Sequence, residues 1–224
     1  MAEIMNFFPL TIYTGMVEEH EQLKAQLAPR VQAMVDGQGH PQSAWTGDMH
    51  GHGFLHLEDG FGQLFDALLP HIHNYLDALD IRPGGLDLFV QRSWPVVTQR
   101  GQVVSMHRHE QSHISLVYYL AKPPESGGLR FTMESAPNEV APRLFDDSLQ
   151  RFKTRNTPLN CNIVDLDTEE GQVLVFPSKA LHATLPSEAD ADRISISADI
   201  ALMLRDDNNF EHLLPAFSRW RRLG

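Results

Sequence analysis

The hydrophobic period of the chain changes once, near Gly85, and this change constrains the fold more than any other feature of the sequence. Before Gly85, apolar residues recur at helical spacing. After it, apolar and β-branched residues gather in short runs separated by Pro, Gly and Ser, at residues 86–91, 102–109, 113–120, 129–133, 162–166, 172–176 and 193–204. Seven short strands of this kind predict a β-sandwich or jelly roll.

Two helical segments precede these strands. Between Val17 and Val35 the apolar spacing is irregular, and Pro29 is expected to break or kink the segment. The second segment is more regular, because its apolar residues fall on one helical face: Phe61, Leu64, Phe65, Leu68, Ile72, Tyr75, Leu76 and Leu79. We therefore expect a mainly β fold with N-terminal helices packed outside one sheet.

Composition excludes several classes of protein. The single cysteine, Cys161, rules out an intrachain disulfide and a thiolate cluster, so a metal here would be held by imidazole and carboxylate groups. A net charge of −11 argues against nucleic acid, since a basic footprint occurs only at Arg219, Arg221 and Arg222. The sequence has neither a long apolar run nor a secretory signal, so no membrane association and a cytoplasmic location are expected.

His107 and His109 form a His-x-His pair in one of the predicted strands. Side chains two residues apart on a strand point to the same face, so both imidazoles could bind one ion at about 2 Å. The pair alone is weak evidence, because the chain has 12 histidines. Two surface histidines on an edge strand are an equally good interpretation.

A second segment strengthens the metal hypothesis. The strand that begins after Gly171 ends in a turn at Pro177, which delivers His182. Eleven residues later, Arg193 opens an apolar strand together with Ser195. An arginine in such a strand is costly unless it meets a fixed anion, and a bound dicarboxylate would be that anion.

The order of these motifs resembles the prolyl-hydroxylase-like branch of the 2-oxoglutarate and Fe(II)-dependent dioxygenases, and in particular a bacterial and phage group with a His-x-His motif. The resemblance covers roughly residues 86–204. It depends on the ordered set His107-x-His109, Val117-Tyr118-Tyr119-Leu120, Gly127-Gly128-Leu129-Arg130-Phe131, Phe176-Pro177-x4-His182 and Arg193-x-Ser195.

The resemblance implies a double-stranded β-helix and two cofactors, Fe(II) and 2-oxoglutarate. His107, His109 and His182 would hold the iron, and Arg193, Tyr119 and Ser195 would hold the 2-oxo acid. The reaction implied couples decarboxylation of 2-oxoglutarate to oxidation of a substrate C–H bond. The division expected is an N-terminal helical elaboration at 1–84, the metal-binding β-helix at 85–205 and a helical tail at 206–224.

One position departs from the pattern. Most of the superfamily has Asp two residues after the first histidine, where this chain has His109. Three neutral imidazoles leave the metal one charge more positive than the usual two-histidine, one-carboxylate set. The sequence leaves open whether His109 is the third ligand or a nearby carboxylate such as Glu110 completes the face.

A cupin is the rival interpretation, because Gly101-x5-His107-x-His109 and Gly171-x5-Pro177-x4-His182 also approach the two cupin motifs. His113 would then be the next ligand, and a three- or four-histidine site could serve a 2-oxoglutarate-independent dioxygenase, an isomerase or a binding module. Arg193-x-Ser195 argues against this, since a cupin would not need it. A metal-free binding protein is the third hypothesis.

The remaining expectations concern substrate and partners. His50, His52 and His56 could line a substrate entrance or lie on a surface loop. The substrate could be a small molecule or a peptide, and nothing in the sequence identifies it. The oligomeric state is open, with a homodimer as one alternative.

Overall fold

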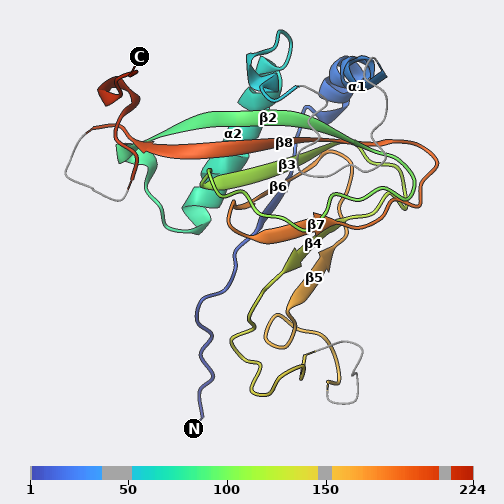
Figure 1. Cartoon of the computed structure of the whole chain (residues 1–224), viewed down its shortest axis with the longest axis vertical. Coiled ribbons are helices and arrows are strands. Elements are labelled where there is room, and N and C mark those ends of the chain that lie inside the picture. The colour runs from blue at the N-terminus through green and yellow to red at the C-terminus, as the bar shows by residue number, and fades with distance from the viewer. Residues whose placement is uncertain (1, 37–51, 146–152, 207–212, 224) are drawn as a thin grey trace.

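The computed structural model describes residues 2–36, 52–145, 153–206 and 213–223. Two antiparallel sheets form the body, a five-stranded sheet in the order β1-β6-β3-β8-β2 and a three-stranded sheet in the order β5-β4-β7. The larger sheet contains β1 (Tyr13–Met16), β2 (Leu86–Thr98), β3 (Ile114–Ala121), β6 (Gln172–Pro177) and β8 (Arg193–Leu204). The smaller contains β4 (Leu129–Thr132), β5 (Ile163–Leu166) and β7 (Leu181–Thr184). Figure 1 shows these two layers.

The faces that the two sheets turn toward each other share a small apolar core. It joins Tyr119, Leu174 and Phe176 of the larger sheet to Leu129 and Phe131 of the smaller one. Burial of this apolar area favours the closed pair of sheets over separate ones. The predicted mainly β, double-stranded β-helix architecture is confirmed.

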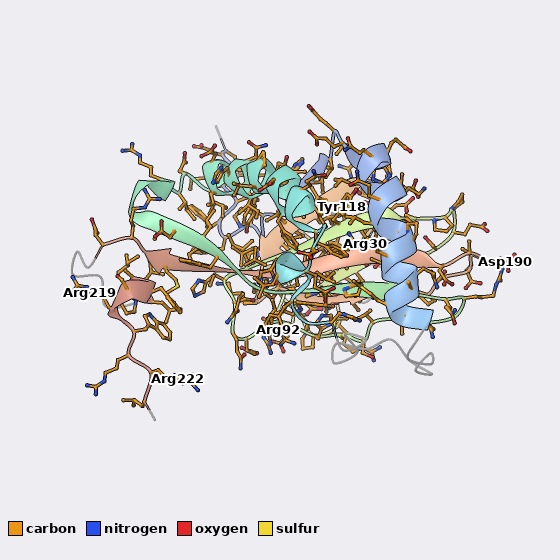
Figure 2. The ribbon with its side chains drawn as sticks, turned by 90° about the horizontal axis from the view of Figure 1, so that it is seen from above. Arg30, Arg92, Tyr118, Asp190, Arg219 and Arg222 are labelled. Carbon is orange, nitrogen blue, oxygen red and sulfur yellow. The ribbon has the colours of Figure 1, made fainter. Side chains whose placement is uncertain are left out.

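Two helices, α1 (His20–Asp36) and α2 (Gly62–Ala78), cover the outer face of the larger sheet. Buried side chains of α1 and α2 meet alternate residues of β3, β6 and β8 in the main core. Seen from above in Figure 2, the helices lie over the strands, and Tyr118 of β3 lies near α1, where its hydroxyl is 2.7 Å from His20 Nδ1. The helix layer and the inter-sheet core therefore occupy opposite faces of one sheet.

Several element boundaries differ from the sequence prediction. α1 continues through Pro29, so the predicted break at this residue is wrong. β1 and β7 were not predicted, because neither segment (YTGM and LHAT) contains a run of apolar or β-branched residues that stands out from the sequence around it. Residues 102–109 form no continuous strand; they contain one isolated β-bridge, from His107 to His182, and a few further backbone hydrogen bonds to the same segment. Their partner lies about 75 residues further along the chain, which no local pattern shows.

The predicted tail begins as β8 ends. Its described residues contain a short helical turn, η4 (Phe217–Arg219), and Leu214 pairs with Met203 of β8. Figure 2 shows Arg219 and Arg222 projecting at one end of the molecule, far from Asp190 at the other end. Among the described helices, none combines the length and the apolarity that crossing a membrane requires.

Candidate metal centre

Three imidazoles converge between the sheets, from two segments far apart in the sequence. His107, His109 and His182 each offer a ring nitrogen, and these nitrogens lie within 4.8 Å of one another. Ring centroids are 4.2 Å apart for His107 and His182, and 5.1 Å apart for His107 and His109. The backbone enforces this, since His107 and His182 exchange N–H to carbonyl bonds at 2.9 Å and His109 N donates to Ser178 O.

The other ring nitrogen of each histidine is held by an acceptor. His107 Nδ1 lies 2.6 Å from Ser105 O, and His182 Nδ1 lies 2.8 Å from Ala180 O. His109 Nδ1 lies 2.5 Å from the carboxylate oxygen Asp199 Oδ1. A carbonyl or carboxylate oxygen accepts, so Nδ1 carries a hydrogen in all three rings, and in the neutral form of each ring Nε2 carries the lone pair. All three side chains thus present the tautomer that a metal needs.

The electrostatics keep two of these imidazoles neutral. Burial lowers the pKa of His107 to about 4 and that of His182 to about 3, and the neighbouring histidines push in the same direction. Both rings are therefore uncharged at neutral pH, with lone pairs free. Imidazole donors suit Fe, Zn, Cu and Ni, and the set fits the ferrous ion that the resemblance implies.

A buried carboxylate stands behind His109. Asp199, on β8, accepts from His109 Nδ1 and from Ser115 Oγ, the latter at 3.0 Å. Ser178 and Ser112 extend this network, with 2.9 Å between the Ser115 and Ser178 hydroxyls and 2.7 Å between those of Ser112 and Ser178. The carboxylate is only 8% exposed. It is thus part of the interior of the site.

The proposed 2-oxoglutarate residues lie in the same cavity. Arg193, Tyr119 and Ser195 line it together with the three histidines. Arg193 is 1% exposed; Nη1 donates to Ser126 O at 2.6 Å and Nη2 to Thr98 Oγ1 at 3.1 Å. Within the described part of the chain, Arg193 Nε and the Tyr119 hydroxyl are buried without a hydrogen-bond partner. Burial raises the pKa of Tyr119, so its hydroxyl remains a donor.

Lys122 adds a second cation that sequence reasoning missed. Its side chain is only 6% exposed, and its Nζ lies 3.9 Å from Asp167. Burial lowers its pKa, Asp167 opposes this, and Arg193 is close enough to lower it further. The position directly after β3 was the available signal, because Lys122 follows an apolar run that ends beside the cavity. Lys122 is not among the residues that line the cavity, so the guanidinium of Arg193 is the cation of that lining.

Other residues singled out from the sequence lie away from the cluster. Glu110 is exposed and pairs with Arg108 at 3.1 Å, so its carboxylate does not complete the metal face. His113 is exposed, and its Nδ1 accepts from the Leu202 amide at 2.9 Å. A four-histidine cupin site including His113 is therefore not formed.

The second histidine cluster has local partners. His52 lies 3.0 Å from Glu58, and His56 lies 2.7 Å from the Ser93 hydroxyl of β2. These contacts fix the segment before α2 against the sheet. His50 lies outside the described residues.

A further group of donors, His20, Glu21 and Glu170, is grouped closely enough to hold an ion. Lys24 Nζ, however, lies 2.5 Å from Glu170 Oε1, and His20 Nδ1 is bonded to the Tyr118 hydroxyl. The ammonium group occupies the place of a cation. These residues tie α1 to the sheet.

Asp199 was also missed, although a signal was present. Arg193, Ser195, Ser197 and Asp199 alternate with apolar residues along β8, which places four polar side chains on one face. The sequence interpretation used only Arg193 and Ser195 of this strand. That the three histidines bind metal, and that the chain divides at 84 and 205, both stay predictions.

Comparison with known proteins agrees with this geometry. Residues 92–199 match a model of the family described as "Putative 2OG-Fe(II) oxygenase". None of the curated proteins compared matches the chain. The match spans just under half of the chain; it agrees with the resemblance inferred from the motifs and with the expectation of an enzyme of this class.

Solved structures share the fold at low identity. The non-heme alpha ketoglutarate dependent carbocyclase SnoK from nogalamycin biosynthesis is 14% identical with a TM-score of 0.57, over 88% of this chain and 83% of that one. A prolyl-4-hydroxylase from Pseudomonas putida is 15% identical with a TM-score of 0.50, over 85% and 86%. Iron-bound HygX from Streptomyces hygroscopicus is 14% identical with a TM-score of 0.53, over 86% and 82%.

Proposed function

We propose that this chain, whose residues 92–199 match the model of a 2OG-Fe(II) oxygenase family, is a dioxygenase that oxidises a C–H bond of a small molecule or peptide. Fe(II) would be held by His107, His109 and His182, and 2-oxoglutarate by Arg193, Tyr119 and Ser195. One observation carries the proposal: three imidazoles with free Nε2 atoms share a cavity with a buried guanidinium that has an unpaired donor.

The protein's own groups bind and orient. The three histidines would hold the ion through their ring nitrogens. The bound iron and 2-oxoglutarate supply oxygen activation, which no side chain of the cavity can provide. Phe131 and Phe176 pack around His182, with Phe176 4.9 Å from its ring, and keep water from that side.

Arg193 supports 2-oxoglutarate in particular. None of the described acidic side chains forms an ion pair with it, and leaving a guanidinium buried without an anion costs several kcal/mol. A carboxylate reaching Nε would complete its hydrogen bonds. The Tyr119 hydroxyl would donate to the same carboxylate. Ser195, two residues after Arg193 on β8, would donate to another oxygen of 2-oxoglutarate.

Substrate, partners and location complete the proposal. Three fold neighbours are a prolyl-4-hydroxylase, an epimerase and a carbocyclase, so they support no single substrate. We expect no nucleic-acid or membrane partner, from the net charge of −11 and the absence of a long apolar run in the sequence. A cytoplasmic location is supported by the single cysteine, and a homodimer remains an alternative to a monomer.

The test is anaerobic titration of the Fe(II)-loaded protein with 2-oxoglutarate. Chelation should give a weak visible absorption band, and Arg193→Gln should weaken 2-oxoglutarate binding by at least about tenfold, because one charged hydrogen-bonded contact contributes roughly 1.5–3 kcal/mol. Arg205→Gln, just beyond β8 at an exposed pair with Asp87, is the matched control and should bind normally.

Circular dichroism and thermal unfolding of both variants would show whether each is folded. A folded, iron-loaded wild-type protein that gives no band, together with unchanged 2-oxoglutarate affinity in Arg193→Gln, would contradict the proposal. That result would favour the cupin-like alternative with a three-histidine site.

A further inference from the structure

The metal site lacks the negative charge that a carboxylate ligand supplies. Three imidazoles surround the position of the ion, and Glu110, the carboxylate nearest in sequence, points to solvent with Arg108. A divalent ion in this setting keeps two positive charges inside a largely buried cavity, which is unfavourable unless an anion lies close.

We propose that Asp199 supplies this charge through His109, so that His109 and Asp199 together act as one anionic metal ligand. This inference rests on the proposed metal site. Asp199 would be a positioning residue, because it acts through the imidazole and does not touch the ion. The link is the 2.5 Å contact between His109 Nδ1 and Asp199 Oδ1.

The hydroxyl network around Asp199 is arranged to stabilise a negative charge on its carboxylate. Ser115 donates its single hydrogen to Asp199 Oδ1. It must therefore accept from Ser178, and Ser178 in turn accepts from Ser112. Three hydroxyl hydrogens thus point along one chain toward the carboxylate. Such a chain strengthens each bond and stabilises negative charge at its end.

Burial makes this charge effective. Asp199 lies on the inner face of β8, opposite Ser115 of β3 in the sheet register. Among the described residues, the basic side chain paired with it is His109 alone. Burying a carboxylate without a cation costs free energy. In the described part of the chain, no lysine or arginine pairs with Asp199. A cation bound at His109 Nε2 is the partner that would compensate this charge.

Two consequences for the metal follow. Electron density from the carboxylate makes His109 a stronger donor, which raises affinity for divalent ions. The nearby negative charge also favours the ferric over the ferrous state, as a directly bound carboxylate does. The pair therefore replaces in function the aspartate that the sequence lacks at position 109.

The experiment compares Asp199→Asn with Asp199→Ala and wild type. Asparagine keeps the shape and can keep an acceptor for His109 Nδ1 and Ser115, so it removes the charge and leaves the ring orientation. We expect Asp199→Asn to bind Co(II) about 10–100-fold more weakly by calorimetric titration, the range for lost outer partners of metal-bound histidines. The Fe(III)/Fe(II) reduction potential should rise. The rise is 59 mV for each tenfold decrease in the ratio of Fe(III) affinity to Fe(II) affinity.

The matched control is Asp87→Asn, an exposed carboxylate on the neighbouring strand β2 that pairs with Arg205, and it should leave both quantities unchanged. Asparagine behaving as wild type while alanine loses the metal would overturn the proposal, because orientation alone would then be the role of Asp199. Reduced thermal stability of Asp199→Asn with unchanged affinity and potential would overturn it too. If the wild-type protein binds no Co(II), the proposed metal site itself is contradicted. Of the outcomes named here, only this one also contradicts the proposed function.

Discussion

Each histidine of the cluster uses one ring nitrogen for the protein and keeps the other for a ligand. The acceptors differ. His107 and His182 each use the backbone carbonyl two residues before them in the chain, whereas His109 uses the carboxylate of Asp199. Carbonyl acceptors fix the tautomer without adding charge, whereas the carboxylate does both. The three imidazoles are therefore chemically unequal, although the sequence presents them alike.

Removing His182 should abolish tight metal binding. His182→Ala takes away the most buried of the three donors and the ring that packs on Phe176. We expect at least a 100-fold loss of Co(II) affinity by calorimetry. His113→Ala, at an exposed histidine outside the cluster, should bind like wild type; equal losses in the two variants would contradict the assignment.

The metal-free protein should lose stability as the pH falls. The folded-state pKa values of His107 and His182, about 4 and about 3, lie below the unfolded value of 6.5. Between pH 6.5 and about 4 the unfolded chain binds protons that the folded chain excludes, so the free energy of unfolding decreases as pH decreases. Urea unfolding at pH 7 and pH 5 measures this.

A His107→Gln, His182→Gln double variant serves as the comparison. Its free energy of unfolding should decline less between pH 7 and pH 5 than that of wild type. The same decline in both proteins would show that other groups cause it.

At the scale of elements, β8 connects the two sides of the molecule. Its apolar residues Ile194, Ile196, Ala198 and Ile200 face the helices, while Arg193, Ser195, Ser197 and Asp199 face the cavity and its surroundings. Strand alternation thus separates packing from chemistry residue by residue. A one-residue slip would exchange the two sets, so the register with β2 and β3 is essential to the site.

The turn before β4 should tolerate no side chain. A Cβ on Gly128 would overlap the backbone carbonyl oxygen of Leu166 on β5, and backbone cannot move aside as a flexible side chain can. Gly128→Ala should lower the free energy of unfolding by roughly 1–3 kcal/mol in urea, as overpacking does.

Gly84→Ala is the control, because nothing lies within 4 Å of the added carbon. Its effect should be small. A Gly128→Ala protein as stable as Gly84→Ala would show that β4 and β5 can separate without cost.

At the scale of the whole molecule, two cores lie on opposite faces of the larger sheet. The helix-side core provides most of the buried apolar residues, whereas the inter-sheet core is small and shares its space with the cavity. Stability and ligand binding therefore depend on different residues. Buried polar groups in the cavity lower the stability of the packing between the two sheets. The larger core on the helix side compensates for this loss.

Leu64→Ala should separate the two properties. Leu64 is fully buried in α2, so its truncation should cost about 2–5 kcal/mol of unfolding free energy. The additional stability given by saturating Co(II), measured in the same urea experiment, should match that of wild type, because the site lies on the other face of the sheet. A loss of that increment would show that the helices shape the metal site.

Sequence alone determined the class of fold, most of the strands around the motifs and six of the residues that line the cavity. Local patterns carry this information: alternation marks β3 and β8, and a Pro-containing turn marks the approach to His182. Only the tertiary structure decided the charge of the site. It moved Glu110 and His113 outward and set Asp199 behind His109, because contacts between residues 90 positions apart depend on sheet register, which no local period encodes.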